Sequence, residues 1–493
     1  MPAYYLEALT VALGIALLMV EAFGPAHSKR HVGVFAAFGL GIILVFSFFA
    51  IGPDKAREGA GWAEWPLWQF YAFDSVARFY KGFAIVCTIL VILMSLDYRS
   101  VLSRFTDHPT TESGTGEYFA LPVFACAGMM WMASAKDLAG AFVALELVTI
   151  TFYILVAYLR RNVGSLEAGV KYLILGALST GFLVYGIAWI YGTLGTMNLE
   201  LIGEKIGEVE STVPVLFGIG LILVALGFKI GAVPMQVWIP DVYQGAPTPT
   251  TAFLSVGSKA AGFVLLIRFL EPFLGEGSPV AGSVTAMLLI MAVATLLFGN
   301  LAAIAQTNFK RLLAYSSIAH AGFLVLALAA WKPAGQAEGL GSSETVSFYL
   351  ATYLLMTLAA FFVLAQIRIR SGSEELDAFK GLGRRDPLVA ILMTVIMAAL
   401  AGVPLTAGFL GKFFVFSLAV EAAQWWGVGI AFIGAAAGFY YYFKLIRSMW
   451  WEDSEEESPV ELPYISRVCV IALTSAVIVL GVWPQPVLWL LGA

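Results

Sequence analysis

Fourteen long apolar runs, separated by short polar stretches, occupy most of this chain of 493 residues. About 20 residues of apolar helix cross the hydrocarbon core of a bilayer. The runs lack the alternating pattern of an outer-membrane barrel, whereas a helix satisfies its own backbone hydrogen bonds within lipid. The runs lie at about residues 3–24, 31–52, 74–97, 118–135, 138–159, 168–192, 213–240, 248–270, 280–305, 311–331, 345–369, 387–417, 423–450 and 466–491. The sequence therefore predicts an all-α integral membrane protein with about 14 transmembrane helices.

The composition also points to lipid as the solvent, with 60 % hydrophobic and 12 % charged residues. Soluble proteins carry about 25 % charged residues, so these charges are too few to cover a surface that faces water. The first run has no signal-peptide pattern, because Glu7 precedes any basic residue. We expect Glu7 and Glu21 to lie at the membrane interface. Cys87, Cys126 and Cys469 lie in separate apolar runs and are expected to be packing residues.

The distribution of basic residues between the loops predicts the orientation of the chain. The loops on one side hold 16 basic residues, Lys310 among them, and the other side holds 8 when Arg78, Lys81 and Arg268 near span ends are included. The positive-inside rule puts the richer side inside, and an even number of spans then puts both termini outside. Four of the 28 basic residues remain, all of them within spans: Lys171, Lys229, Lys259 and Lys412.

Polar landmarks recur along the chain and indicate an internal repeat. Glu146, Lys229 and Lys259 are spaced by 83 and 30 residues, and His320, Lys412 and Lys444 are spaced by 92 and 32. The two sets are offset by about 180 residues, or five spans, and an odd number of spans inverts the second copy, as in many transporters. We therefore expect two inverted five-helix repeats, spans 4–8 and 9–13. The expected organisation is an N-terminal three-span segment 1–117, a first repeat 118–270, a second repeat 271–450, and an acidic loop with the last span 451–493.

Two of the predicted spans contain residues that break helices. In span 7, Gly231 and Pro234 follow Lys229 directly, and in span 12, Gly402, Pro404 and Gly408 precede Lys412. Proline removes a backbone donor and clashes with the preceding turn, and broken helices at mid-membrane depth are typical of transporter sites. We therefore predict that helices 7 and 12 are broken beside their lysines.

Other segments between the spans carry less information. Residues 60–73 resemble an aromatic belt at the outer interface. Residues 198–210 place Leu199, Ile202, Ile206 and Val209 on one face, which predicts a short amphipathic helix on the membrane surface. The acidic run 452–457 is expected to be a solvated loop.

Charges inside spans are the strongest functional signal of the chain. A charge at a helix centre costs about 2.5–3.5 kcal/mol, so four lysines would cost on the order of 10 kcal/mol if unpaired. Because burial disfavours the charged lysine and a nearby carboxylate favours it, a buried Glu/Lys set suits proton relay. Lys171 and Lys444 near span ends are also compatible with snorkelling, and His320 with an ordinary core histidine. The candidate relay residues are Glu146, Lys171, Lys229, Lys259, His320 and Lys412.

Motifs for cofactors are absent from the sequence. There is no P-loop, no dinucleotide fingerprint and no cysteine cluster, and His320 is the one histidine within a predicted span, which argues against paired haem ligation. We therefore expect no cofactor and no metal in this chain.

Several longer motifs carry a resemblance to a known family. They are residues 229–234 (KIGAVP), 238–249 (WIPDVYQGAPTP), 258–259 (SK), 299–301 (GNL), 306–320 (QTNFKRLLAYSSIAH), and 402–404 and 411–413 (GVP, GKF). Together they resemble the antiporter-like subunits of proton-pumping NADH–quinone oxidoreductase, respiratory complex I. The DVYQGAP form of the loop and the lysine, rather than glutamate, at position 412 are most similar to subunit N. Three N-terminal spans, which some animal versions lack, suggest a bacterial or plastid-type form.

The resemblance implies a role for each candidate residue. Glu146 and Lys229 would form an ion pair, Lys259 would be the central relay, and Lys412 would lie toward the outer exit. Lys171 matches the lysine of span 6. His320 would lie between Lys259 and Lys412 and complete the row.

The resemblance also implies the setting of the chain. NADH or another donor, FMN, iron–sulfur clusters and a quinone would be bound by other subunits. The expected partners are subunit M, the small membrane subunits K, J, A and H, and lipids of a bacterial inner membrane, with no nucleic acid. The alternatives are a subunit of a multi-subunit cation/proton antiporter or of a membrane-bound hydrogenase-type complex, and a free-standing secondary transporter. A scaffold would leave the buried lysines unexplained.

Overall fold

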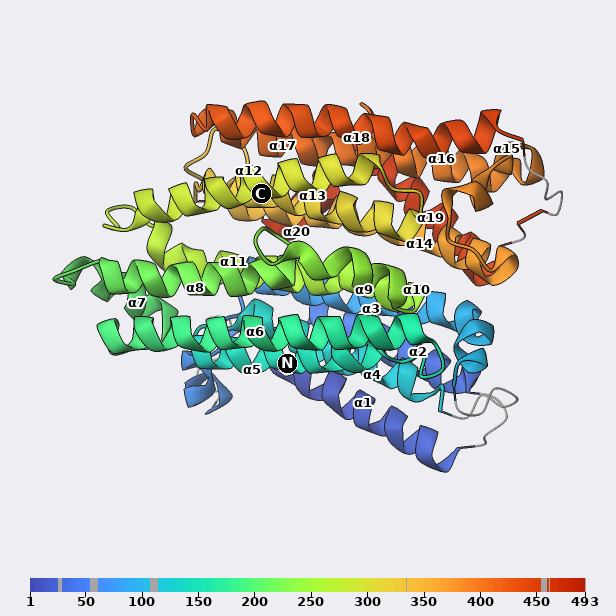
Figure 1. The fold of residues 1–493 in the computed structure, drawn as a ribbon. Coiled ribbons are helices and arrows are strands. Elements are labelled where there is room, and N and C mark those ends of the chain that lie inside the picture. Colours follow the sequence, from blue (N-terminus) through green and yellow to red (C-terminus); the bar gives the residue numbers. More distant parts are fainter. Residues whose placement is uncertain are drawn as a thin grey trace.

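The computed structural model describes residues 1–24, 29–53, 61–106, 114–333, 335–453, 459–460 and 462–492. Its long helices run side by side along one common direction (Figure 1). The N-terminal helices lie on one flank of this bundle, and α18 lies on the opposite flank. Within the described ranges the chain forms helices and isolated β-bridges but no β-strand. The prediction of an all-α membrane protein is confirmed. Part of the acidic run, residues 454–457, lies outside the described residues.

The N-terminal three-span segment contains α1, α2 and α3, which are Tyr5–Phe23, Arg30–Phe48 and Ser75–Arg104. Two short 3-10 turns, Gly61–Glu64 and Pro66–Gln69, precede α3. Helix α3 is the buried member of the three and packs against α14, α10 and α11. It therefore connects the N-terminal segment to the centre of the bundle.

The middle of the chain contains the next eight helices and a π-turn. They are α4 Glu117–Ser134, α5 Leu138–Val156, α6 Val163–Leu194, α7 Leu199–Lys205, α8 Val213–Ile230, α9 Ile239–Gly245, α10 Thr248–Phe253, the π-turn Leu254–Ser258 and α11 Lys259–Leu274. The π-turn joins α10 to α11 into one continuous helical segment, which is buried inside the bundle along most of its length, with Glu271 exposed near its end. The sequence did not predict this π-turn.

The described residues of the C-terminal part form nine α-helices: α12 Ala281–Ile304, α13 Phe309–Ala329, α14 Ser342–Ser371, α15 Leu382–Arg385, α16 Pro387–Ala401, α17 Ala407–Glu421, α18 Trp425–Trp451, α19 Tyr464–Val482 and α20 Gln485–Leu491. Helices α13 and α14 are buried along most of their length. Together with α10–α11 they form the centre of the bundle, which is where the sequence places Lys259 and His320.

The helices correspond to the predicted spans. Twelve helical segments of the described chain are long and apolar enough to cross a membrane. The two remaining predicted spans are α4 and the interrupted pair α16–α17. The helix at α7 is also as predicted, but its apolar residues Leu199 and Ile202 are buried. Helix α7 packs against α11, where Gly203 faces Pro272. Its apolar face is therefore covered by the chain itself and not by the membrane surface.

Candidate proton-relay site

Helix α8 ends inside the bundle because Gly231 takes the left-handed conformation, with φ 80°. The backbone N–H groups of Gly231 and Ala232 both donate to the carbonyl oxygen of Gly227, at 2.9 and 2.8 Å. This pair of hydrogen bonds to one carbonyl oxygen is a glycine C-cap, which closes a helix without a side-chain cap. Pro234 then prevents the helix from resuming at once. The predicted break of span 7 is confirmed.

Helix α16 ends in the same way at Gly402, with φ 93°. The N–H groups of Gly402 and Val403 donate to the carbonyl oxygen of Ala398, each at 3.0 Å. Helix α17 begins five residues later at Ala407. The predicted break of span 12 is confirmed, and the end of α16 therefore presents free carbonyl groups inside the bundle.

Lys412 occupies the end of α16. Its buried ammonium donates to the carbonyl oxygens of Leu400 at 3.1 Å and Ala401 at 2.7 Å. Carbonyls at a helix C-terminus carry partial negative charge and favour a cation. The half-helix therefore solvates Lys412 in place of a carboxylate.

Lys229 lies two residues before the break of α8 and is 4 % exposed. Its ammonium donates to the hydroxyl of Thr149 at 3.1 Å. Thr149 is three residues after Glu146 on α5, so the two side chains share one face of that helix. The carboxylate of Glu146 accepts a hydrogen bond from Thr180 on α6 at 2.7 Å. Glu146 and Lys229 interact electrostatically, and threonines lie between them.

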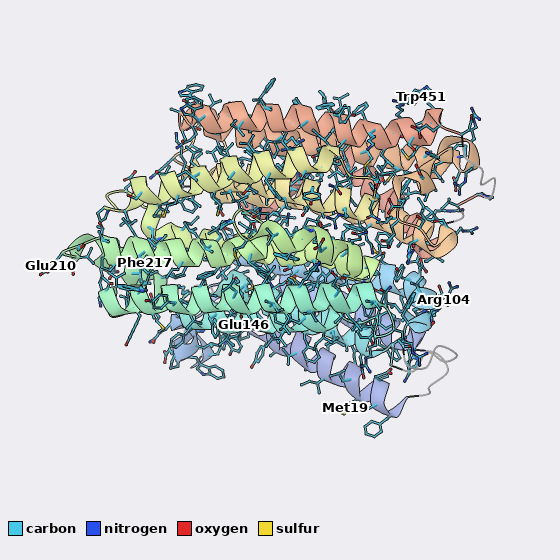
Figure 2. All side chains as sticks on the ribbon, in the orientation of Figure 1. Met19, Arg104, Glu146, Glu210, Phe217 and Trp451 are labelled. Carbon is cyan, nitrogen blue, oxygen red and sulfur yellow. The ribbon has the colours of Figure 1, made fainter. Side chains whose placement is uncertain are left out.

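A small cavity of about 10 Å³ lies where the threonine bonded to Lys229 and the threonine bonded to Glu146 meet. Its lining includes Thr149, Thr180 and Lys229. That volume is at the lower limit of what one water molecule needs, and the lining supplies polar partners for it. Figure 2 shows Glu146 about midway along the bundle, between Glu210 at one end and Arg104 at the other. The sequence predicted an ion pair here, and the structure brings the two residues to one site without direct contact.

Lys259 follows the π-turn Leu254–Ser258 directly. A π-turn inserts one extra residue into a helix, and such turns are frequent at functional sites. The Lys259 ammonium, 2 % exposed, donates to the backbone oxygen and the hydroxyl of Ser317 on α13. It also lies 5.5 Å from the ring centroid of Tyr353. The contacts of this ammonium are therefore neutral groups.

His320 lies one helical turn from Ser317 on the same face of α13. Its Nδ1 is 2.7 Å from the hydroxyl of Tyr349, and its Nε2 is 3.1 Å from the hydroxyl of Tyr442. A hydroxyl can donate or accept, so these two tyrosines satisfy a neutral imidazole in either tautomer. His320 is therefore a fully hydrogen-bonded buried group next to the serine that holds Lys259.

His320 and Lys412 meet at a second small void. Asn300 and Tyr441 line the same void, and the Tyr441 hydroxyl donates to the Asn300 side chain at 3.3 Å. The Lys412 ammonium lies 5.5 Å from the ring centroid of Phe323, three residues after His320. The structure thus brings Lys259, His320 and Lys412 into one succession of neighbouring polar groups.

Lys171 lies apart from this succession. Its side chain is 43 % exposed and forms ion pairs of 2.8 Å with Glu167 and with Asp241. A surface pocket of about 260 Å³ surrounds Lys171 and Asp241. The structure favours the snorkelling interpretation of Lys171 over membership of the buried row.

Comparison with known proteins identifies the family of this chain. The family described as NADH:quinone oxidoreductase/Mrp antiporter, TM, matches residues 135–438. The chain belongs to this family. NADH-quinone oxidoreductase subunit N of Heliobacterium modesticaldum is 37 % identical over 97 % of this chain and 96 % of that protein. NADH-quinone oxidoreductase subunit N of Desulforamulus reducens is 36 % identical over 96 % of this chain and 94 % of that protein.

Solved structures give the same family and fold. A chain of respiratory complex I from Thermus thermophilus is similar with a TM-score of 0.77 and 31 % identity, and the match covers 97 % of both chains. A chain of an archaeal membrane-bound sulfane sulfur reductase has a TM-score of 0.84 and 26 % identity, over 99 % of this chain and 96 % of that chain. A chain of the Mrp complex from Dietzia sp. has a TM-score of 0.81 at 18 % identity, over 99 % of this chain and 96 % of that chain, which shows the fold alone.

This member of the NADH:quinone oxidoreductase/Mrp antiporter family also buries charges that the sequence analysis placed elsewhere. Glu7, expected at the interface, is 4 % exposed, and Lys81, counted near a span end, is 1 % exposed. The two form an ion pair. Lys310, counted in a loop, is 2 % exposed and pairs with Glu374 at 2.8 Å. The sequence did not predict that Glu7 and Lys81 are buried in the protein and paired, and Lys229, Lys259 and Lys412 are not the full set of buried lysines.

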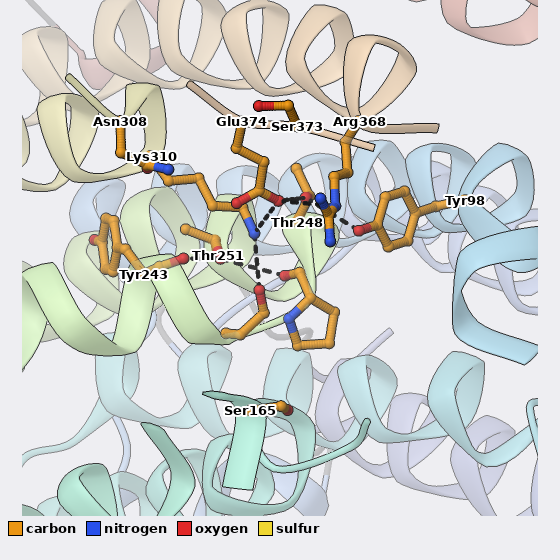
Figure 3. A network of polar contacts seen from close by, with 12 residues as sticks. Tyr98, Ser165, Tyr243, Thr248, Thr251, Asn308, Lys310, Arg368, Ser373 and Glu374 are labelled. Carbon is orange, nitrogen blue, oxygen red and sulfur yellow. Dashed lines mark hydrogen bonds and ion pairs between the residues drawn. The ribbon is translucent and has the colours of Figure 1, made fainter. Parts of the chain in front are cut away.

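Figure 3 shows the polar network around Lys310 at the start of α10. Lys310 donates to the carbonyl oxygen of Ala246 at 2.9 Å, and Glu374 also contacts Arg368 at 3.6 Å and Thr248 at 3.5 Å. A hydrophobicity profile does not reveal this network, since its members come from separate loops and helix ends.

The tyrosines around His320 are another set that the sequence analysis missed. Tyr349 and Tyr353 are four residues apart on α14 and face His320 and Lys259. The i, i+4 spacing of two tyrosines in an apolar helix was the available signal. Hydroxyl groups are less conspicuous than charges in an apolar run, although they serve equally well as hydrogen-bond relays.

Proposed function

We propose that this chain is the proton-translocating subunit N of an NADH–quinone oxidoreductase. In this proposal Glu146, Lys229, Lys259, His320 and Lys412 carry protons, and quinone reduction takes place in other subunits. Full-length similarity to proteins named NADH-quinone oxidoreductase subunit N supports the assignment. The chain is in this sense part of an oxidoreductase complex without a redox site of its own.

The main support for a proton relay is the set of hydrogen-bond partners of the buried lysines. Lys259 and Lys412 contact hydroxyl and carbonyl oxygens, and no carboxylate lies within ion-pair distance of either among the described residues. A buried ammonium held by neutral groups is costly compared with one that is paired. Such a lysine can pass a proton to a neighbour when a second charge arrives, whereas a firmly paired lysine cannot.

The contacts support the proposed order of the relay. Glu146 and Lys229 exchange a proton through the threonine-lined cavity, and Ser317 and His320 connect Lys259 with the void that Lys412 also lines. Lys412 is the last member and lies at the exit. Lys171, at a half-exposed position beside Asp241, would serve as a collector of protons at the inner edge.

The two broken helices support the proposed domain organisation. Segments 118–270 and 271–450 each contain one helix that ends in a glycine C-cap of the same hydrogen-bond pattern, followed by Val-Pro. Each break lies next to a buried lysine. We take the two segments as inverted repeats, with 1–117 and 451–493 as flanking segments.

The proposed setting is a bacterial inner membrane with both termini outside, because 16 basic residues lie on the inner side against 8 on the other. NADH or another donor, FMN, iron–sulfur clusters and the quinone belong to other subunits. The neighbours would be subunit M and the small membrane subunits K, J, A and H.

A cation/proton antiporter subunit is the second candidate, since the family description covers Mrp antiporters as well. The two candidates predict different partners. Affinity purification of the tagged chain from its own membranes, followed by mass spectrometry, should recover quinone-oxidoreductase subunits. Recovery of antiporter subunits alone would support the second candidate instead.

The relay is tested in the assembled complex with Lys229→Met and Lys259→Met. Each variant keeps the volume of the side chain and removes the protonatable group, so proton pumping should fall by about tenfold or more. Lys205→Met, on the surface helix α7, is the matched control and should pump normally. Normal pumping by both buried variants in a fully assembled complex would contradict the relay.

A further inference from the structure

A second buried ion pair lies in the N-terminal segment, away from the proposed relay. It joins Glu7 on α1 to Lys81 on α3. Both side chains are almost fully buried, with 4 % and 1 % of the residues exposed. The proposed relay does not use this pair, and segment 1–117 lies outside the two repeats.

Each member of the pair has a further partner. The Lys81 ammonium donates to the carbonyl oxygen of Met130 on α4 at 3.2 Å and lies 4.8 Å from the ring centroid of Tyr71. The Glu7 carboxylate accepts a hydrogen bond from the Tyr71 hydroxyl, at 3.1 and 3.2 Å to its two oxygens. An aromatic face and a carbonyl oxygen both attract an ammonium. Lys81 can therefore stay charged when its bond to Glu7 is lost.

Tyr71 separates this pair from a large polar pocket. The pocket has a volume of about 450 Å³, and its lining includes Tyr71, Asp74, Lys136, Arg268 and Glu271. It lies where α3 begins and α11 ends. A polar space of this size holds many water molecules. Tyr71 lines the pocket although the residue is only 1 % exposed, and its hydroxyl contacts the buried carboxylate of Glu7, so Tyr71 is the residue between the pocket and that carboxylate.

The pocket is at the same end of the bundle as the start of the chain. Tyr4, just before α1, stacks on Trp65 and also packs against Trp68, and Trp68 lines the pocket. The predicted orientation makes this the outer face.

We propose that Glu7 and Lys81 form a proton-exchange site that communicates with water in this pocket through the hydroxyl of Tyr71. The site is separate from the Glu146–Lys412 row. Its ligand is a proton, and its position gives the N-terminal segment an activity beyond packing.

A hydronium ion in the pocket gives a proton to the Tyr71 oxygen, and Tyr71 gives its own hydroxyl proton to the Glu7 carboxylate. The products are water and a neutral carboxylic acid, and Tyr71 is unchanged. The ion pair then loses its attraction, and Lys81 remains an ammonium held by Met130 and the Tyr71 ring. The reverse sequence returns the proton to the pocket.

Other ionisable groups interact with the pair and must be included in its titration. Cys126 on α4 interacts with both members, and Arg268 and Asp74 interact with Lys81. Arg268 and Asp74 are bound to each other at 2.6 Å. Their opposite charges largely cancel at the distance of Lys81, which leaves Glu7 as the group that changes charge.

The test is infrared difference spectroscopy on the assembled complex in sealed membrane vesicles. Acidifying the pocket face should produce the C=O stretch of a newly protonated carboxyl group. Glu7→Gln should abolish that band, and Tyr71→Phe should slow its appearance by about tenfold or more, because it removes the hydroxyl that relays the proton. Tyr4→Phe is the matched control: its hydroxyl has no hydrogen-bond partner, so the rate should stay as in the wild type.

The double variant Glu7→Gln/Lys81→Met guards against misfolding, because it leaves no unpaired charge. It should assemble and lack the band. Spectra of the wild type and the double variant that are identical would overturn the proposal and make the pair structural. A band that responds equally to acid on the opposite face, or that forms at the wild-type rate in Tyr71→Phe, would overturn the route through the pocket.

Discussion

The ammonium of Lys412 lies 2.7 Å from the carbonyl oxygen of Ala401, the last residue of α16. Lys412 itself belongs to α17, so the second half of a broken helix supplies the cation that the first half needs. Carbonyl groups at the end of a helix that lies inside a membrane need a partner other than water, and Lys412 provides one for Leu400 and Ala401. The break and the lysine therefore stabilise one another.

Two substitutions at position 412 separate charge from proton transfer. Lys412→Arg keeps a cation on the α16 carbonyls, but a guanidinium does not release its proton in proteins. Lys412→Met removes both properties. We expect both variants to lower proton pumping of the assembled complex by about tenfold or more, and Lys412→Met alone to lower its thermal stability. Pumping at the wild-type rate in Lys412→Arg would mean that the charge, not the proton, is what matters.

The glycine that ends α8 should not tolerate a side chain. Gly231 has a φ of 80°, and a Cβ there would lie 2.3 Å from Cδ1 of Ile239. Gly231→Ala should cost about 1–2 kcal/mol for the left-handed backbone alone, with the clash in addition. Gly220→Ala, on the same helix with open space around its Cα, is the control and should gain up to about 1 kcal/mol of helix propensity. Thermal denaturation of the complex distinguishes the two variants. Equal midpoints for Gly231→Ala and Gly220→Ala would show that the left-handed conformation at Gly231 does not require glycine.

The breaks, spans and lysines could be predicted from the sequence because each rests on local chemistry. Gly231 with Pro234, and Gly402 with Pro404, each combine a residue that adopts the left-handed conformation easily with one that lacks a backbone donor. An apolar run of about 20 residues has few alternatives to a membrane helix. A lysine within such a run is conspicuous in any window.

The pairing of side chains could not be predicted, because it depends on which helices become neighbours. Glu7 and Lys81 are 74 residues apart, and each taken alone resembles an interfacial charge near a span end. The hydroxyls of Tyr349 and Tyr442 come to His320 from α14 and α18. Glu146 and Lys229 were expected to form an ion pair, whereas their hydrogen bonds go to Thr180 and Thr149, which follow from packing that no periodicity encodes.

The two hydroxyl partners of His320 should be needed for relay through the imidazole. Tyr349→Phe removes the 2.7 Å bond to Nδ1, and Tyr442→Phe removes the 3.1 Å bond to Nε2. A neutral imidazole needs one donor and one acceptor partner. Each substitution should therefore lower the pumping rate several-fold, and by no more than about tenfold, while the complex still assembles. Tyr315→Phe, whose ring packs on Phe298, is the control. Unchanged pumping in both variants would return His320 to the role of a core histidine.

The ion pair between Asp74 and Arg268, beside the large polar pocket, predicts a pH dependence of stability. Burial alone would raise the pKa of Asp74, but two hydrogen bonds and the charge of Arg268 outweigh burial and lower that pKa below its usual value. A carboxylate with a lower pKa in the folded state stabilises the fold above its unfolded pKa of about 4. That contribution is lost as the pH falls through the folded value.

The substitution Asp74→Asn tests this dependence. The side chain is about half exposed, so the loss should be modest, about 1–2 kcal/mol. The difference between wild-type and variant denaturation temperatures should be constant above about pH 5 and shrink below about pH 4. Glu204→Gln on the exposed face of α7 should show no such difference. If the difference in denaturation temperature between the wild type and Asp74→Asn increased as the pH was lowered, the pKa of Asp74 would not be lowered by folding.

Lys310 at the start of α13 pairs with Glu374 in the loop after α14, and the energetics of this pair can be measured with a double-mutant cycle. The pair is largely buried, since the side chains of Lys310 and Glu374 are 2 % and 11 % exposed, and its nitrogen and oxygen atoms are 2.8 Å apart. Lys310→Met leaves Glu374 with the more distant Arg368 at 3.6 Å and the hydroxyl of Thr248 at 3.5 Å, and Glu374→Gln leaves Lys310 with the carbonyl of Ala246.

Each single change should therefore cost about 3–5 kcal/mol, because it leaves an uncompensated charge. The double variant Lys310→Met/Glu374→Gln should recover most of that loss, since two neutral side chains of similar volume replace the pair. The measurement is the denaturation midpoint of the assembled complex, together with its yield. If the two single losses add in the double variant, the residues do not act as a pair and the network in Figure 3 is held by its other contacts.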